Sequence, residues 1–413
     1  MEQHKRMILM PEYMKQFRCI GSKCEDSCCI GWTVSLDKKR YQNYRKNNNM
    51  ELKPIFKSMV RRSHNNKTDE FYGRIVMDEL GRCPFLDESK LCKIQDILGE
   101  EYLSNICASY PRFTSRIDGK LERSATTSCP EIARLALLNP NGICFEQIQE
   151  DEDLRIMINS SFDTEGYSLY NKPEKYFWDI RLFCISLLQD RDYSLSERVM
   201  LLGIVNNRIE GLYKMQKTHD IPKVLESLAK MISAGNFREE LDKVPTQVEI
   251  QLKILETMIN ERLLIGTLNE RYIECLNETL LGLENTEDEK IETTIKKYEE
   301  AYDSYLKDYL KEKEYILENF LVNEYFRWMM PFGGFTSIWD SYIFICVVYG
   351  MIKLHLVGMA EYHKELNDEL TLKLIQSFSK VILHNNQYIQ SIINLIKENG
   401  LDTLAYMTIL SRN

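Results

Sequence analysis

The stretch Cys19-Ile-Gly-Ser-Lys-Cys24-Glu-Asp-Ser-Cys28-Cys29 opens a dense run of cysteines in the first third of this 413-residue chain. Of the 12 cysteines in the chain, eight lie between residues 19 and 129: Cys19, Cys24, Cys28, Cys29, Cys83, Cys92, Cys107 and Cys129. Such a cluster indicates disulfides, a metal centre or reactive thiols. The other four are isolated in apolar contexts, which is typical of small core residues: Cys144, Cys184, Cys275 and Cys346.

A metal centre is the interpretation that the surrounding sequence favours. Residues 1–17 carry several charges and no apolar run long enough for a secretory signal, so we expect a reducing, cytoplasmic location. In that compartment clustered cysteines more often bind metal or act chemically than form disulfides. Thiolates suit both zinc and iron–sulfur clusters, and the spacing leaves the choice between them open. Cys83 and Cys129 each precede proline, as a ligand cysteine of bacterial ferredoxins also does.

The adjacent pair Cys28-Cys29 adds a geometric constraint. Neighbouring side chains point to different sides of the backbone in a helix or a strand, so the two sulfurs are not expected to bind one metal atom in the same way.

The cysteine segments resemble a known group of proteins. Phe17-x-Cys19, Cys83-Pro-Phe-Leu, Leu91-Cys92-x-Ile and Cys107-x-x-Tyr-Pro are similar to the cysteine-cluster motif described as zinc- or iron-chelating. The continuation through Ser128-Cys129-Pro-Glu, followed by a large helical part, resembles the flagellin lysine-N-methylase family. The motifs that carry this resemblance cover about residues 10–140.

The resemblance implies an enzyme that transfers methyl groups from S-adenosylmethionine to lysine ε-amines of flagellin or another lysine-rich protein. It also implies an iron–sulfur cluster, of the 4Fe-4S type, held by the eight clustered cysteines, with zinc as the alternative. The methyl donor follows from the resemblance alone, because the chain contains no Gly-x-Gly-x-x-Gly dinucleotide motif. The Cys-x3-Cys-x2-Cys spacing that resembles radical S-adenosylmethionine enzymes is also absent, since position 31 is glycine.

Three residues are candidates for the chemistry of methyl transfer. The acceptor amine must be neutral, whereas lysine has a pKa of about 10.4 in water. Tyr110 and Glu131 are the groups we name for removing the proton, although a packed ring and a charge favoured in a helix first turn would explain them structurally. Arg112 lies between a candidate ligand and a predicted strand, where it could touch substrate, cofactor or cluster.

Charge and cysteine density divide the chain near residue 150. Residues 1–150 have a net charge of +4 and residues 151–413 a net charge of −13. The predicted fold is mainly α: an N-terminal cysteine-rich α+β metal-binding domain with few strands (1–150), followed by a large all-helical domain (151–413).

Local patterns predict several elements. Residues 37–62 read as helices, the first of them capped by Asp37, and residues 71–77 as a strand. Residues 112–117 and 120–125 flank a turn at Asp118-Gly119 and predict a hairpin, and residues 129–138 predict a short helix. The hydrophobic segment 339–359 is predicted to be a buried central helix. Its apolar part, residues 342–352, is shorter than the roughly 20 residues needed to span a bilayer.

The net charge of −9 and the lack of a basic stripe argue against nucleic-acid binding, and no membrane partner is expected. Two other functions stay open. One is a non-enzymatic protein with a structural zinc or iron site. The other is a thiol redox sensor in which Cys28 and Cys29 oxidise.

Overall fold

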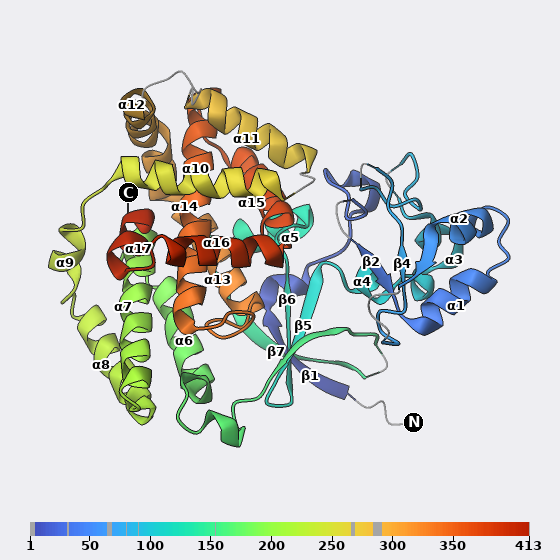
Figure 1. The fold of residues 1–413 in the computed structure, drawn as a ribbon, viewed down its shortest axis with the longest axis horizontal. Coiled ribbons are helices and arrows are strands. Elements are labelled where there is room, and N and C mark those ends of the chain that lie inside the picture. The colour runs from blue at the N-terminus through green and yellow to red at the C-terminus, as the bar shows by residue number, and fades with distance from the viewer. Residues whose placement is uncertain are drawn as a thin grey trace.

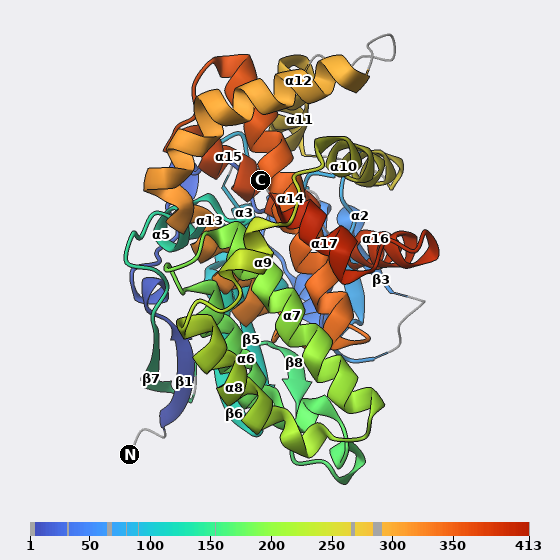
Figure 2. The same ribbon diagram turned by 90° about the vertical axis from the view of Figure 1, so that its left-hand side faces the viewer.

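The computed structural model describes residues 5–30, 33–63, 68–79, 81–89, 91–152, 154–265, 269–283 and 291–412. The protein is mainly helical, and its two small sheets lie in the N-terminal part of the chain, as predicted. Figure 1 shows a cysteine module, which we define as residues 19–109, beside a larger body of helices. The sheet that contains the N-terminal strand lies below and between them, and Figure 2 shows this strand at the edge of the helical body.

The larger sheet has five strands in the order β7-β1-β6-β5-β8. Their bounds are β1 Lys5–Pro11, β5 Arg112–Ile117, β6 Lys120–Ala125, β7 Phe145–Asp151 and β8 Ile158–Phe162. The predicted hairpin is confirmed as β5 and β6, whose strands pair antiparallel around Asp118 and Gly119. Sequence patterns did not reveal β1, β7 or β8. Because β8 lies beyond residue 150, the prediction that residues 151–413 are entirely helical was wrong, whereas the domain boundary itself stays a prediction.

The cysteine module has a core of its own around a three-stranded sheet of order β2-β4-β3. Its elements are β2 Val34–Leu36, α1 Lys38–Lys46, α2 Leu52–Met59, β3 Val60–Arg62, β4 Gly73–Ile75, α3 Lys93–Leu98 and α4 Asn105–Ser109. In this core Tyr44 and Phe56 stack with their ring centroids 4.5 Å apart.

Two predictions for the cysteine module need correction, and one is confirmed. The Asp37 carboxylate accepts a hydrogen bond of 2.8 Å from the Arg40 amide, so the predicted cap of α1 is confirmed. Helix α2 ends at Met59, and residues 60–62 pair with β4 instead of continuing the helix. The predicted strand 71–77 is shortened to Gly73–Ile75.

The helical body consists of α5 Pro130–Leu137, α6 Phe177–Leu188, α7 Leu195–Lys214, α8 Ile221–Ser233, α9 Arg238–Asp242, α10 Val248–Leu264, α11 Glu270–Gly282, α12 Ile291–Ala301, α13 Lys307–Arg327, α14 Ile338–His363, α15 Asp368–Val381, α16 Asn386–Glu398 and α17 Leu404–Ser411. Helix α5 agrees with the predicted helix 129–138, and Pro130 occupies its first turn.

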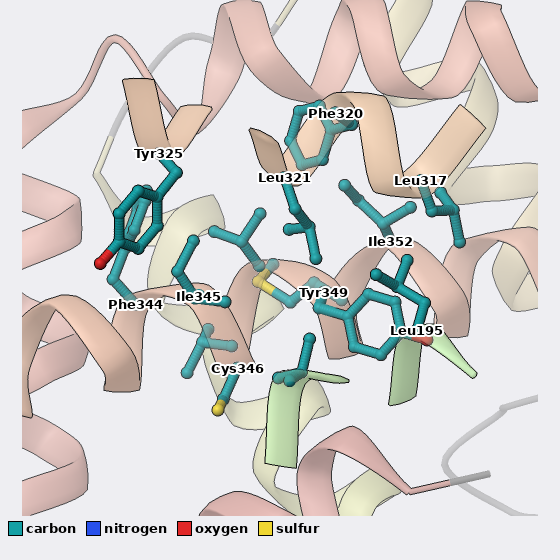
Figure 3. Close-up of a cluster of buried hydrophobic side chains, with 14 of the residues drawn as sticks. Leu195, Leu317, Phe320, Leu321, Tyr325, Phe344, Ile345, Cys346, Tyr349 and Ile352 are labelled. Carbon is teal, nitrogen blue, oxygen red and sulfur yellow. The ribbon is translucent and has the colours of Figure 1, made fainter. Parts of the chain in front are cut away.

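Helix α14 is the central helix of this body. Figure 3 shows Tyr349 and Ile352 of α14 near Leu317 of α13, with Cys346 on the side of α14 that faces away from α13. By length and composition α14 could cross a membrane, so the argument that the apolar segment is too short was wrong. All of its most apolar 18-residue window is buried within the protein, however, which confirms the prediction of a buried central helix.

Buried polar contacts join α13 to the N-terminal segments. The Asn323 side chain donates to the Ala125 carbonyl at 3.0 Å and accepts from the Tyr13 hydroxyl at 2.6 Å. The Asn319 amide donates to the carbonyls of Leu137 and Asn139 at 3.2 and 2.8 Å. These bonds replace the water that the backbone loses on burial, and they fix the position of the chain on both sides of Cys129.

Two glycines predict opposite effects of added volume. A Cβ on Gly282 would lie 1.9 Å from the Gly358 carbonyl oxygen, where α11 crosses α14, whereas a Cβ on Gly211 in α7 meets nothing within 4 Å. Gly282→Ala should therefore lower the free energy of unfolding by about 1–3 kcal/mol, through overpacking. Gly211→Ala should raise it by about 0.5–1 kcal/mol, because alanine loses less conformational entropy in a helix. Urea titrations would measure both, and equal stabilities would refute the close approach.

Buried His355 predicts a loss of stability in acid. Its Nδ1 donates to the Met351 carbonyl at 2.7 Å, so Nε2 accepts from the Tyr272 hydroxyl at 3.1 Å. Burial lowers the pKa of His355 from 6.5 to about 4. The stability that the neutral ring provides is thus complete above pH 6.5 and decreases, by at most about 3 kcal/mol, as the pH falls toward 4.

Urea titrations between pH 7 and 4 would measure this dependence. His355→Gln should remove part of the pH dependence, while the same change at His219, whose side chain is 73% exposed, should leave it intact. An unchanged slope in His355→Gln would contradict the assignment.

Candidate metal centre

Backbone hydrogen bonds bring the first two cysteine segments together. The Cys83 amide donates to the Cys29 carbonyl at 2.9 Å, and Ile30 and Arg82 form an antiparallel bridge. Further along the chain, the Lys93 amide donates a hydrogen bond to the Phe85 carbonyl at 2.8 Å. The segment 81–93 is thereby folded against the loop that carries Cys28 and Cys29.

Three other cysteines lie at the starts of helices. Cys92 immediately precedes α3, Cys107 lies in the first turn of α4, and Cys129 is the N-cap residue of α5. Burial raises the pKa of Cys92, and hydrogen bonds from the backbone amides of Gln95 and Ile94 to its sulfur partly oppose this rise. The amides of Glu131 and Ile132 do the same for Cys129. Such donors favour a thiolate over a thiol.

The cysteines surround two adjoining cavities. The larger has a volume of about 280 Å³, and seven of the eight clustered cysteines line it: Cys19, Cys24, Cys28, Cys29, Cys92, Cys107 and Cys129. The smaller, of about 60 Å³, is lined by five: Cys28, Cys29, Cys83, Cys92 and Cys107. The predicted set is therefore brought together around one region of the fold.

The thiols encircle these cavities and do not converge on one point. Among the side chains that the structure describes, no group of three or more His, Cys, Asp or Glu residues is arranged to hold a single metal ion. The number of centres and the choice of metal stay predictions.

Most of these thiols are neutral in the metal-free protein. Burial raises the pKa of Cys83 to about 11 and the pKa values of Cys107 and Cys129 to about 12. Cys28 differs, because a hydrogen bond from Cys29 lowers its pKa to about 7 against the effect of burial, and the Lys380 charge adds to the lowering. A bound metal would displace the remaining thiol protons.

The donor set fits a thiolate-bound metal group. The smaller cavity is lined by five cysteine sulfurs and by neither histidine nor carboxylate. Soft thiolates of this kind select zinc or iron–sulfur clusters over hard cations, and backbone N–H donors beside the sulfurs offset the negative charge of such a group.

The three predicted catalytic residues lie in different surroundings. Tyr110 lines both cavities, and its hydroxyl lies 3.1 Å from Ser128 Oγ. Arg112 lines the larger cavity, with its guanidinium 5.1 Å from the centre of the Phe17 ring. Glu131 is not among the residues that line either cavity, and its carboxylate accepts hydrogen bonds from Arg134 at 2.9–3.0 Å.

Sequence patterns missed several polar residues of the larger cavity. Asp26 and Ser128 line it beside the cysteines, and Lys380 reaches it from α15. His384 Nε2 lies 2.8 Å from Ser128 Oγ. Proximity to Cys24, Cys28 and Cys129 could have drawn attention to the first two. No sequence signal links residues 380–384 to a segment more than 250 positions earlier.

The four isolated cysteines do not line these cavities. Cys184, Cys275 and Cys346 are fully buried in the helical core, as predicted. Cys144 is exposed, so the prediction of a core position was wrong for that residue.

Comparison with known proteins gives a consistent result. The model of the FliB lysine N-methylase C-terminal domain matches residues 181–410. Lysine-N-methylases of Salmonella typhimurium and Salmonella choleraesuis are each 23% identical over 391 residues, which cover 92% of either chain. The flagellar biosynthetic protein FliU of Salmonella muenchen is 32% identical over 137 residues, covering 33% of this chain and 80% of the relative. No solved structure matches the chain.

The fold and the site define a thiol-rich protein in which a helical body closes a cysteine-lined cavity. The family match extends over more than half of the chain and includes most of that helical body. The chain belongs to the FliB lysine N-methylase family.

Position around the cavities predicts which cysteines matter for metal. Cys107→Ala should lower the zinc or iron content of the anaerobically purified protein several-fold, because it removes a sulfur that lines both cavities. Cys275→Ala is the matched control, since this cysteine is fully buried in the helical core and should leave metal content unchanged. Elemental analysis checks both variants. Equal losses would show that metal content follows general stability and not the cavity.

Proposed function

We propose that this protein transfers methyl groups from S-adenosylmethionine to lysine ε-amines of flagellin or of another lysine-rich protein. The observation that carries the proposal is that similarity to lysine-N-methylases covers 92% of the chain, including both the helical body and the cysteine module. The name of the shorter relative, a flagellar biosynthetic protein, supports flagellin as the substrate.

The proposal includes an iron–sulfur cluster, of the 4Fe-4S type, with zinc as the alternative metal. Cys28, Cys29, Cys83, Cys92 and Cys107 would hold it at the smaller cavity, and the remaining predicted ligands, Cys19, Cys24 and Cys129, line only the larger one. When bound, an iron–sulfur cluster supplies electron transfer or a Lewis-acidic iron.

The residues of the larger cavity suit the handling of an amine and its charge. Burial, together with the nearby Cys129, raises the pKa of Tyr110 well above 10, so its hydroxyl stays protonated and acts as a hydrogen-bond partner toward Ser128. Arg112 and Lys380 are cations in the lining of this cavity. Lys380 is paired with Asp26, so Arg112 is the cation that would balance the negative charge of thiolates. Walls such as Phe17 and Leu103 would favour the neutral form of a substrate amine by excluding water.

The acidic charge of the helical part also supports a lysine-rich substrate. Residues 151–413 carry a net charge of −13, and opposite charges at long range accelerate association.

The decisive test is methylation by the anaerobically purified protein. Incubation with S-adenosylmethionine and flagellin should add 14 Da or multiples of it to flagellin lysines, as seen by mass spectrometry. Heat-denatured enzyme and lysine-acetylated flagellin are the controls. Iron, sulfide and zinc analysis of the same sample identifies the metal.

Two outcomes would contradict the proposal. Stoichiometric zinc without methyl transfer or S-adenosylmethionine binding would indicate a protein with a structural metal. Freely titrating thiols without any metal would instead indicate a redox sensor.

A further inference from the structure

Lys380, in the last turn of α15, reaches from the helical body into the cysteine cavity. Its Nζ donates to both carboxylate oxygens of Asp26 at 2.9 Å and to the Ser27 carbonyl at 2.8 Å. The two side chains are 13% and 10% exposed. A largely buried ion pair therefore connects two segments that are 354 positions apart in the sequence.

The same face of α15 makes further bonds to both sides of the cavity. One turn before Lys380, the Gln376 amide donates to Asp26 at 2.9 Å and to the Ser128 carbonyl at 2.8 Å. The hydroxyls of Ser379 and Thr127 lie 2.7 Å apart. Helix α15 thus fastens both the loop that contains Cys28 and the segment that contains Cys129. The loop has further contacts: Glu25 pairs with Arg134 of α5 at 2.6 Å, and Asp26 accepts a hydrogen bond from the Asn269 side chain at 3.4 Å.

We propose that Lys380 is a positioning residue that holds the Cys24–Cys29 loop, defined as residues 24–29, against the helical body and places a fixed positive charge beside Cys28. The consequence for methyl transfer rests on the function proposed above. The structural part stands without it, because the ion pair exists within the protein alone. Through this contact, the domain that carries the family match sets the position of cysteines that lie outside it.

The energetics of buried ion pairs make the role testable. Removing one partner leaves an uncompensated charge in a poorly solvated site, whereas removing both charges leaves none. Lys380→Met should therefore release the loop, Lys380→Arg should keep it, and the double variant Lys380→Met/Asp26→Asn should be less perturbed than Lys380→Met. Lys373, on the same helix, pairs with Glu278 at 3.1 Å and does not line the cavity, so Lys373→Met is the matched control.

Hydrogen–deuterium exchange of the full-length purified protein measures the loop directly. Amide exchange in a peptide covering residues 24–29 should rise about tenfold or more in Lys380→Met, since local opening then costs less. It should stay near the wild-type rate in Lys380→Arg and Lys373→Met. Unchanged exchange in Lys380→Met, or an equal rise in Lys373→Met, would overturn the inference.

Reduction potentials separate the effect of charge from that of loosened packing. A positive charge stabilises the reduced form of an anionic metal group, so Lys380→Met should have a lower potential than wild type and Asp26→Asn a higher one. The double variant, which keeps the net charge of the original pair, should return toward wild type. Potentials that all shift in one direction would refute the charge effect.

Methylation measured on the same samples keeps the two proposals apart. If wild type and Lys380→Met methylate flagellin equally and the loop exchanges at the same rate in both, the positioning role is refuted and the proposed function is supported. If the exchange rates follow the expected pattern but no sample methylates flagellin, the proposed function is refuted and the positioning role is supported.

Discussion

The hydrogen bonds of Asn323 are the contact on which the arrangement of sheet and helices depends. One buried amide satisfies the Ala125 carbonyl at the end of β6 and the Tyr13 hydroxyl that follows β1. A buried carbonyl without a partner is costly, so the sheet must dock on α13 in one register. Because Ala125 is only four residues before Cys129, this docking also determines where the last clustered cysteine enters its cavity.

Patterns that depend on near neighbours could be read from the sequence. Asp37 marks the start of α1, and the Asp118-Gly119 turn defines the hairpin of β5 and β6. Both signals act over a few residues, so the sequence alone was enough to predict them. Strand β1 could not be found in this way. Its partners are β7, paired from Lys5 with Asp151 onward, and β6, so its stability comes from segments more than 100 residues away.

The same distinction applies to the candidate site. The density of cysteines predicted a common site, and the structure places all eight around two adjoining cavities. The polar residues beside these cysteines could not be predicted from the sequence, because Asp26 contacts Gln376 and Lys380 only in the folded helical body. The family match begins at residue 181, yet its helix α15 completes the cavity that the first 130 residues begin. The two parts of the chain therefore share one cavity.

The place of Lys380 in the chain has a consequence for how the protein is made. During synthesis the clustered cysteines leave the ribosome some 250 residues before Lys380 does. At roughly 5–20 residues per second, this leaves an interval of roughly 10–50 s in which the thiols exist without the helix that closes over them. All eight clustered cysteines have been made by then, but the cavity they line is still open on the side that Lys380 of α15 covers. The cavity is therefore closed only after residue 380 has been made, late in translation.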